Sequence, residues 1–321
     1  MNTALLFAPV QSGLLEVETL LRAQADGAHL DLRAALDHLL ASGGKRIRPA
    51  LCLLTGQMLA GSHEKLVTLS AAVEMLHTAT LVHDDLIDGA LLRRGMPTLN
   101  ARWTPAATVL TGDFMFARAA KLAAEADTLP LMKLFAETLA IIVNGELTQL
   151  FSSRGVISRE DYAKRIHAKT ASLFEMATRA AAVVSPVDEE TVEAMRQYGY
   201  FLGMAFQIMD DILDFTGEQE TVGKPVGSDL LQGLVTLPAI YYAETHPNDP
   251  DVVCLNGGCY TEQERMERLI EAIRNSSAVV RSMQEAEDYV ERASEKLAAM
   301  PDNEEKQALQ ELARFIVARK I

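Results

Sequence analysis

The stretches LVHDDLID (81–88) and FQIMDDILDF (206–215) carry the same aspartate spacing inside apolar, helix-like sequence. On an α-helix the first and last aspartates of each set lie one turn apart on the same face. Carboxylates that gather on a face of low polarity repel one another unless a cation lies between them. Few, hard oxygen ligands are typical of Mg²⁺ that keeps waters and bridges to phosphates, so the pattern predicts a two-sided magnesium clamp for a diphosphate. Its ligands are Asp84, Asp85, Asp88, Asp210, Asp211 and Asp214.

A long helix is predicted over residues 64–88 and carries the first acidic set at its end. Successive residues of a helix turn by about 100°, so His77, Thr80, Asp84 and Asp88 fall on one stripe. This stripe favours His77 as a ligand contact over a buried structural histidine. The helix becomes apolar before the acids, and it therefore combines a metal-binding end with an apolar wall.

Polar residues beside the two acidic sets complete the candidate site. Arg93 and Arg94 follow the first set directly, and a pair of guanidinium groups matches phosphate oxygens well. Alternatively, the two arginines are a helix-end charge pair that the helix dipole favours. Gln207 lies on the same helical face as the second set, whereas His83 lacks such alignment and is interpreted as structural.

Composition predicts one compact enzyme, with residues 1–321 as a single domain. The chain has 321 residues and 49% hydrophobic content, enough for a large core. Its net charge of −14 argues against a nucleic-acid partner, which requires a basic surface. The start MNTALLFAPV has no basic signal region, and we expect no membrane-spanning segment and a cytoplasmic location. Three cysteines without metal-ligand spacing are interpreted as reduced and structural.

Nearly every long segment has helical periodicity, which predicts an all-α fold. GGKRIRP (43–49) is expected to be a loop that leads into a helix ending near Gly61. VVCLNGGCYT is interpreted as a helix connection, with a small hairpin as the alternative. The stretch from 216 to 233 looks like a loop long enough to cover a site. Further helices are predicted near 10–24, 30–41, 64–88, 105–125, 129–152, 159–184, 188–215, 230–245, 261–274, 276–299 and 303–318.

Seven stretches, in order along the chain, resemble the trans-prenyltransferases, the polyprenyl diphosphate synthase family. The resemblance runs from about residue 40 to 240, and the C-terminal LARFIVARK is also similar to the ending of that family. The stretches are GGKRIRP, HTATLVHDDLID, LRRG, GDFMFARA, HAKTASLF, FQIMDDILDF and GKPVGSDL.

The resemblance implies an all-α isoprenoid synthase fold, usually a homodimer, in which the aspartate sets face each other across a deep hydrophobic pocket. It implies two or three Mg²⁺ ions and two substrates, isopentenyl diphosphate and an allylic diphosphate. Isopentenyl diphosphate would be bound by Lys45, Arg48, His77 and Arg94. The allylic diphosphate would be met by Arg93, Lys169, Thr170, Gln207 and Lys224.

The expected chemistry needs no side-chain nucleophile. Mg²⁺ and the cations Arg93, Lys169 and Lys224 would neutralise the allylic diphosphate as it leaves. The double bond of isopentenyl diphosphate then attacks the allylic carbocation, and proton loss leaves a chain five carbons longer. Water would quench the cation, so the pocket must be apolar and closed, and the loop after Asp214 is the expected lid.

Several positions depart from the family pattern. Leu234, in GLVTLP, and Met96, in LRRGMPT, stand where the family usually has lysine, and Thr104-Pro105 replaces a step that usually contains glycine. These changes bear on rate or substrate more than on fold. Glu146 and Gln149 match a family pattern, but polar packing explains them equally well.

Product length depends on the residues just before the first acidic set. Ala79 and Thr80 are small where short-chain members tend to have a bulky aromatic residue, so a growing chain should pass them and continue along Leu76. This favours a product of C30 to C50, with transient membrane contact for release. The floor of the tunnel is then expected deeper, at Phe135, Leu139 or Ile142.

Four alternatives stay open beside this interpretation. The first is a short-chain farnesyl or geranylgeranyl diphosphate synthase. The second is a terpene cyclase or a head-to-head synthase, which does not usually carry two such aspartate sets. The third is a non-catalytic subunit of a heteromeric synthase, which would be expected to lose aspartates or Arg93. A generic helical metal-binding scaffold would leave GGKRIRP and HAKT unexplained.

Overall fold

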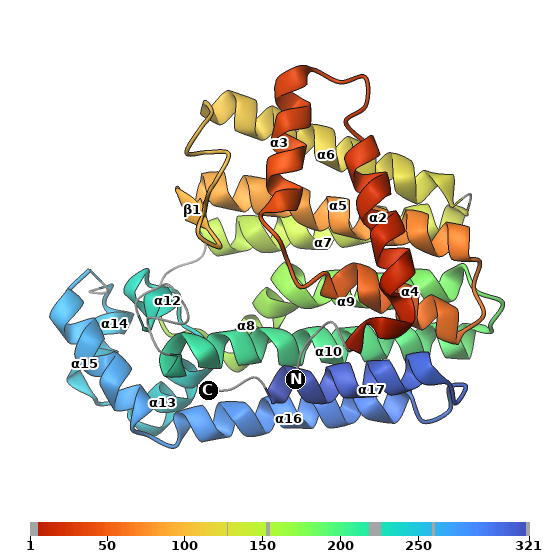
Figure 1. Cartoon of the computed structure of the whole chain (residues 1–321). Helices are drawn as coiled ribbons and strands as arrows, with labels where there is room; N and C mark the ends of the chain where they lie inside the picture. Colours follow the sequence, from red (N-terminus) through yellow and green to blue (C-terminus); the bar gives the residue numbers. More distant parts are fainter. Residues whose placement is uncertain (1–5, 127, 152–154, 218–225, 259–260, 319–321) are drawn as a thin grey trace. The chain divides into compact units, whose positions relative to one another are not determined.

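The structure is a computed structural model that describes residues 6–126, 128–151, 155–217, 226–258 and 261–318. It is helical almost throughout, so the all-α prediction is confirmed (Figure 1). The elements in chain order are η1 (Ala8–Val10), α2 (Gln11–Ala23), α3 (Leu30–Ala41), α4 (Ile47–Met58), α5 (His63–Ile87), β1 (Leu92–Arg93), β2 (Met96–Pro97), α6 (Pro105–Glu125), α7 (Leu129–Phe151), α8 (Arg159–Ile166), the π-helical turn η2 (His167–Ala171), α9 (Ser172–Val183), α10 (Glu189–Thr216), α12 (Ser228–Leu231), α13 (Leu237–Thr245), α14 (Pro250–Asn256), α15 (Gln263–Arg274), α16 (Ala278–Lys296) and α17 (Glu304–Val317).

The chain forms two compact units, each assembled from three separate stretches. Unit 1 comprises Met1–Thr138, Leu173–Gly199 and Leu297–Glu311, and unit 2 comprises Leu139–Ser172, Tyr200–Lys296 and Leu312–Ile321. The first acidic set therefore belongs to unit 1 and the second to unit 2. The single domain expected over 1–321 stays a prediction.

The core of unit 1 is built around α5. This helix packs mainly against α6 and also against α4 and α2 (Figure 1). From Leu66 to Ala79 almost every side chain of α5 is buried. A helix that is apolar on all sides suits such a central position. The surrounding helices thus fix α5 firmly, and the first acidic set lies at its C-terminal end.

Two helices of the described chain are long and apolar enough to cross a membrane, although the sequence predicted none. In α5, 72% of the apolar window is buried, which identifies it as a core helix. In α7 only 22% of the corresponding window is buried. Its apolar surface is therefore available for a contact outside the chain.

In unit 2, the C-terminal half of α10 has one apolar and one polar face. Ile208, Ile212 and Phe215 are fully buried. Their spacing of four and three residues puts them on one side of the helix. Asp210 and Asp214 lie off this face. The same periodicity that builds the core of unit 2 therefore keeps Asp210 and Asp214 away from the apolar face, whereas Asp211 is buried beside it. Elsewhere in the unit, α13 packs on α16, and α15 contacts α12 and α14.

The structure differs from the sequence prediction at several boundaries. The helix predicted over 159–184 contains the π-helical turn η2 between α8 and α9, and the helix predicted over 230–245 is divided into α12 and α13. A two-residue hairpin, β1–β2, lies inside the all-α chain and was not predicted. In VVCLNGGCYT, residues 252–256 belong to α14, a helix that was not predicted, and Gly257 and Gly258 form a turn that connects helices.

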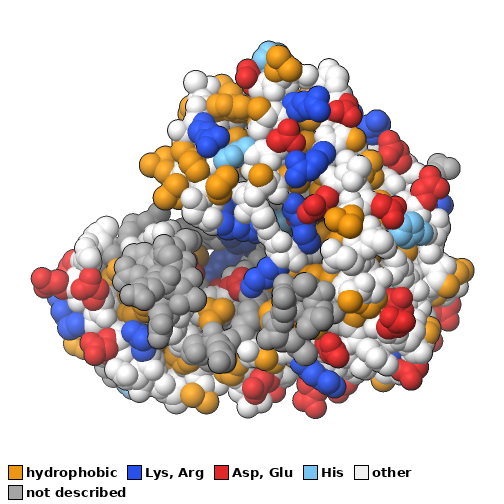
Figure 2. All heavy atoms as spheres, in the orientation of Figure 1, with side chains coloured by type: hydrophobic (Ala, Val, Ile, Leu, Met, Phe, Trp, Pro, Cys, Tyr) orange, Lys and Arg blue, Asp and Glu red, His pale blue; other side chains and the backbone are white. Residues whose placement is uncertain are grey.

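The surface of unit 1 is mixed in character. Over α2 and α3, Figure 2 shows acidic and basic side chains interspersed, without a continuous basic tract. Apolar side chains gather at the end of the unit where β1 and the start of α6 lie (Figure 2). Leu91, Leu92 and Leu110 are among the exposed apolar residues of these segments.

Candidate functional site

The first acidic set occupies the end of α5. Asp84 and Asp85 lie in its last turn, and Asp88 is the C-cap, with its backbone N–H donating to the Asp84 carbonyl at 2.8 Å. Asp85 is buried, at 4% exposure, whereas Asp84 is half-buried and Asp88 is exposed. The C-terminus of a helix carries partial negative charge, so carboxylates are disfavoured there. A bound cation would remove this penalty.

Asp85 is neutralised by the arginine that follows it. Arg93 Nε donates to Asp85 Oδ1 at 2.7 Å. Arg93 is held by the β1–β2 hairpin, in which it pairs with Met96. The two central residues, Arg94 and Gly95, have φ of 51° and 76°, as a type I′ turn requires. The short hairpin therefore sends the adjacent arginines in different directions.

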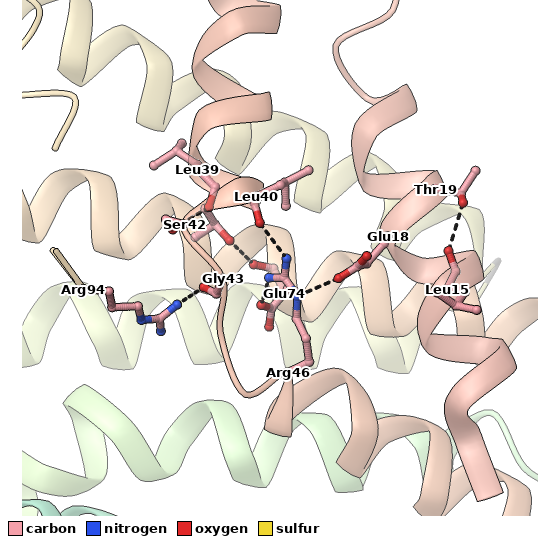
Figure 3. Close-up of polar contacts among 11 residues, drawn as sticks. Leu15, Glu18, Thr19, Leu39, Leu40, Ser42, Gly43, Arg46, Glu74 and Arg94 are labelled. Carbon is pink, nitrogen blue, oxygen red and sulfur yellow. Dashed lines mark hydrogen bonds and ion pairs between the residues drawn. The ribbon is translucent and has the colours of Figure 1, made fainter. Parts of the chain in front are cut away.

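Only the first four residues of GGKRIRP form a loop, since α4 begins at Ile47, and this loop is fixed by an arginine that the sequence analysis did not single out. Arg46 has φ of 48° and turns back toward α5 and α2 (Figure 3). Its Nη1 lies 2.6 Å from Oε1 of the buried Glu74, and its Nε lies 3.4 Å from Glu18 Oε1. Arg94 donates to the carbonyl of Gly43 in the same loop (Figure 3). The loop is thus anchored on both sides, and Lys45 stands exposed within it.

His77 lies among four arginines of unit 1. Burial lowers the pKa of His77 well below its usual value, and the charges of Arg48, Arg94, Arg93 and Arg46 lower it further. The ring is therefore neutral at pH 7, and Arg48 Nη1 lies 3.1 Å from its Nε2. A neutral Nε2 can accept a hydrogen bond from the guanidinium. This concentration of positive charge, with Glu74 and Asp85 as ion-pair partners for two of the arginines, suits a multiply charged anion.

The proposed chain-length residues lie on the same helix. Leu76 and Ala79 are fully buried in unit 1, and Thr80 is half-buried. The Thr80 hydroxyl donates to the His77 carbonyl at 2.8 Å. Phe135 and Ile142 of α7 are also buried.

The second acidic set is held by a network of neutral donors within unit 2. Gln207 Nε2 donates to Asp211 Oδ1 at 2.7 Å, and the Tyr162 hydroxyl donates to Asp211 Oδ2 at 2.8 Å. Thr170 in turn donates to Gln207 Oε1 at 2.6 Å. Burial raises the pKa of Asp211 to about 7 in spite of these hydrogen bonds. Asp210 lies one position before Asp211 and is half-buried.

Asp214 organises the segment that follows α10. Its Oδ1 accepts hydrogen bonds from the backbone N–H and the hydroxyl of Ser228, at 3.1 and 2.7 Å, and its Oδ2 accepts from the N–H of Asp229 at 3.2 Å. These N–H groups begin α12, so a carboxylate there is favourable. The preceding Gly227 adopts φ of 70°. Lys224 lies outside the described residues, as does the whole of 218–225 within the expected lid.

The π-helical turn η2 presents the remaining predicted residues of HAKT. Lys169 Nζ lies 3.4 Å from Glu146 Oε1 on α7, which gives Glu146 an ion-pair role. A Cβ on Gly145 would come within 2.4 Å of the Ala168 Cβ, so the glycine permits the close approach of α7 and η2. π-Helical turns are frequent at functional sites. Here the turn brings Lys169 and Thr170 to neighbouring positions on the same segment.

His83 and Thr104 have the structural roles that their surroundings define. His83 Nε2 lies 3.1 Å from the Val109 carbonyl, and its ring fills the space that Gly112 of GDFMFARA leaves open. Thr104 is the N-cap of α6, with its side chain accepting from Ala107 N–H, and Pro105 is the first residue of the helix. The departure at Thr104-Pro105 is therefore a normal helix start.

The structure thus assembles the predicted residues in two groups, one in each unit. Among the described residues no set of three or more His, Cys, Asp or Glu side chains could hold a metal ion by itself. Unit 1 contains Lys45, Arg48, His77, Asp84, Asp85, Asp88, Arg93 and Arg94, and unit 2 contains Lys169, Thr170, Gln207, Asp210, Asp211 and Asp214.

Sequence reasoning missed Tyr162, Arg46 and Glu74. Tyr162 is 49 residues from Asp211, and Glu74 is 28 residues from Arg46, so no local motif links the partners. For Glu74 the sequence did hold a signal. It is a charged residue in the middle of a helix that is otherwise apolar, and such a residue needs a buried partner.

Comparison with known proteins identifies the family. The polyprenyl synthetase family model matches residues 29–275. Heptaprenyl diphosphate synthase component 2 of Geobacillus stearothermophilus is 36% identical and covers 99% of each chain. The geranyl-diphosphate-specific all-trans-nonaprenyl-diphosphate synthase of Rhodobacter capsulatus is 38% identical over 88% of this chain and 87% of the relative.

Solved structures agree with these relatives. The polyprenyl synthase of Caulobacter crescentus, solved with calcium and isoprenyl diphosphate, superposes with a TM-score of 0.92 at 35% identity, over 100% of this chain and 98% of the other. The fold is therefore the isoprenoid synthase fold that the motifs predicted. The chain belongs to the polyprenyl synthetase family, and it is a trans-prenyltransferase.

Proposed function

We propose that this chain condenses isopentenyl diphosphate with an allylic diphosphate, depends on Mg²⁺, and makes a polyprenyl diphosphate of C30 to C50. The observation that carries the proposal is the arginine cluster around the neutral His77, on the helix that ends in the first acidic set. Arginines bind diphosphate oxygens, and the acidic set holds the metal that a diphosphate brings. The two features together are typical of a metal–diphosphate site.

Each polar group then has a definite task. Arg48, with Lys45, Arg94 and the neutral His77, would bind the diphosphate of isopentenyl diphosphate. Arg93 would meet the allylic diphosphate. In unit 2, Lys169, Thr170, Gln207 and Lys224 would bind an allylic diphosphate. When bound, Mg²⁺ supplies positive charge that stabilises the departing diphosphate.

The acidic sets would hold Mg²⁺ through Asp84 and Asp88 in unit 1 and through Asp210 in unit 2. Asp85, Asp211 and Asp214 also belong to the clamp, and they already carry hydrogen bonds or an ion pair from the protein. A carboxylate has about four lone-pair positions, so such contacts can orient a ligand without using it up. The calcium in the Caulobacter crescentus relative supports a hard cation at this kind of site.

The metal clamp predicts a severe loss of turnover on removal of one ligand. Asp84→Ala and Asp210→Ala should each lower kcat by about 100-fold or more, because charge stabilisation of a leaving group is lost. The measurement is incorporation of labelled isopentenyl diphosphate at saturating substrate, with and without EDTA and added Mg²⁺. Glu125→Ala is the matched control, since Glu125 is an exposed acid at the end of α6. Near-normal turnover in either aspartate variant contradicts the clamp.

The two diphosphate positions predict separate kinetic effects. Arg48→Ala and His77→Ala should chiefly raise KM for isopentenyl diphosphate, because they lie together in the arginine cluster. Arg93→Ala and Lys169→Ala should chiefly impair use of the allylic substrate. Steady-state kinetics with each substrate varied in turn provides the measurement. The opposite pattern would reverse the assigned roles.

Product length is proposed from α5 and from the relatives. Heptaprenyl and nonaprenyl synthases are among the similar proteins, and Ala79 is a small residue at a position where an aromatic side chain would block a growing chain. Ala79→Phe should shorten the product toward C15 or C20 and keep the first condensation fast, because the acidic set is untouched. Chromatography of dephosphorylated products gives the chain length.

The series Ala79→Val, Ala79→Leu and Ala79→Phe separates a blocked tunnel from a disturbed core. Ala79 is fully buried, so enlarging it in a closely packed core would lower the melting temperature. A progressive shortening of product with a nearly constant Tm supports the tunnel. An unchanged product, or a wild-type product of C15 or C20, contradicts it.

We also propose that the chain forms a homodimer through α7. Val143, Leu147, Leu150 and Phe151 are exposed, and their spacing places them along one side of the helix. Leu147→Glu should therefore weaken self-association, as measured by analytical ultracentrifugation. Val280→Glu, which alters an exposed apolar residue of α16, is the control. A monomeric wild-type chain, or a Leu147→Glu variant that sediments like wild type, would exclude this interface.

A second candidate function follows from the name of one relative. A protein called heptaprenyl diphosphate synthase component 2 implies a further component, so this chain would then be one subunit of a heteromeric synthase. All six aspartates and Arg93 are present here, which favours the catalytic subunit. Purified chain incubated alone with Mg²⁺, isopentenyl diphosphate and a series of allylic primers distinguishes the two. Sustained elongation supports the self-sufficient enzyme.

A further inference from the structure

A continuous chain of hydrogen bonds links three segments of unit 2. It runs from the Tyr162 hydroxyl on α8 to Asp211, from Asp211 to Gln207 on α10, and from Gln207 to Thr170 in η2. Tyr162 and Asp211 are 2% and 3% exposed. Asp211 lies 49 residues from Tyr162 and Gln207 lies 37 residues from Thr170, so these contacts help to fix α10 against α8 and η2.

The direction of each hydrogen bond is determined by chemistry. Gln207 presents its Nε2 to Asp211 Oδ1 and its Oε1 to the Thr170 hydroxyl, so Asp211 accepts at both of its oxygens. A reversed amide would put two oxygens against each other. Tyr162 provides the hydroxyl donor at Asp211 Oδ2. Loss of that donor leaves a buried carboxylate oxygen with one fewer partner, and such oxygens move or take up water to recover it.

A shift of Asp211 would also displace two neighbouring residues, Asp210 and Gln207. Asp210 precedes it in the chain, and Gln207 lies one turn before it on α10. Through Gln207 the effect passes to Thr170 and to the turn that carries Lys169. Removing a residue that orients a metal-binding carboxylate commonly lowers metal affinity or activity by about 10- to 100-fold.

We propose that Tyr162 is a positioning residue for the second acidic set and for the Lys169–Thr170 turn. It touches no substrate or metal itself; it holds Asp211, and through Asp211 it fixes Gln207 and Thr170. The inference rests on the proposed function, because it assigns the purpose of this hydrogen-bond chain to binding of an allylic diphosphate with Mg²⁺.

Tyr198 provides a closely matched control, because it is a buried tyrosine outside the candidate site whose hydroxyl also donates one hydrogen bond. It is fully buried, and its hydroxyl donates at 2.9 Å to the backbone carbonyl of Leu309 within unit 1. Tyr162→Phe and Tyr198→Phe therefore each remove one buried hydroxyl and its hydrogen bond. Only the first change touches the chain of donors to Asp211.

The test measures binding and kinetics on the full-length chain. Calorimetry follows Mg²⁺-dependent binding of geranyl thiolodiphosphate, an allylic analogue that reacts very slowly. Tyr162→Phe should weaken this binding by about tenfold and lower kcat/KM for the allylic substrate by a similar factor. KM for isopentenyl diphosphate should stay within about twofold, because the residues assigned to that diphosphate belong to unit 1. Tyr198→Phe should match wild type in binding and kinetics.

A second variant keeps the proposal open to refutation. Thr170→Val breaks the other end of the same chain, so the double variant with Tyr162→Phe should lose less affinity than the product of the two single losses. Full multiplicativity would overturn the proposal. So would a Tyr162→Phe chain that binds like Tyr198→Phe, or one that fails to fold when Tyr198→Phe folds. A wild-type chain that neither binds the analogue nor elongates a primer would instead overturn the proposed function itself.

Discussion

The candidate site depends on how the protein stabilises carboxylates near the C-terminal ends of two long helices. The carbonyls at a helix C-terminus disfavour negative charge, yet α5 and α10 both carry aspartates near their C-terminal ends. Each partly buried carboxylate has to be met by donors or cations. Arg93, Tyr162 and Gln207, and the start of α12 are the protein's own partners for Asp85, Asp211 and Asp214. Much of the polar structure around the site follows from this requirement.

The positive side of unit 1 is organised by a similar constraint. Arg46 is neutralised by the buried Glu74, and this ion pair ties the loop before α4 to the middle of α5. Removing one partner of such a pair would leave a buried charge, which commonly costs about 3–5 kcal/mol. His77 avoids adding charge to the cluster because it stays neutral. The arginines therefore provide a strong positive site whose geometry does not depend on protonation of the histidine near pH 7.

Local sequence patterns predicted the parts of this structure that local physics determines. Apolar periodicity located the long helices, and the aspartate spacing located the two acidic ends. The π-helical turn at HAKT was missed, because a single inserted residue hardly changes the periodicity of a long helix. The β1–β2 hairpin was missed because Arg94, rather than asparagine or glycine, occupies its first positive-φ position. The contacts of Tyr162 with Asp211 and of Glu74 with Arg46 could not be predicted from local sequence, because only the packing of distant segments brings these residues together.

The two acidic sets share a spacing but differ in electrostatics. In unit 1, Arg93 contributes a full positive charge to Asp85, so the set is partly neutralised by the protein itself. In unit 2, Asp211 is held by the neutral donors Tyr162 and Gln207. Arg165 has a minor influence there, since Asp229 acts on Asp211 in the opposite sense. Burial raises the pKa of Asp211 to about 7, so the second set loses part of its negative charge to protonation near neutral pH.

This difference bears on the proposed binding of Mg²⁺ at the two sets. At the second set, a cation would favour the ionised form of Asp211, so its binding would compete with the proton that burial favours on this carboxyl near pH 7. At the first set, a cation would compete with the guanidinium of Arg93 for Asp85, and phosphate oxygens would offer Arg93 another anion. Identical aspartate spacing would therefore give a metal ion two different competitors in one chain.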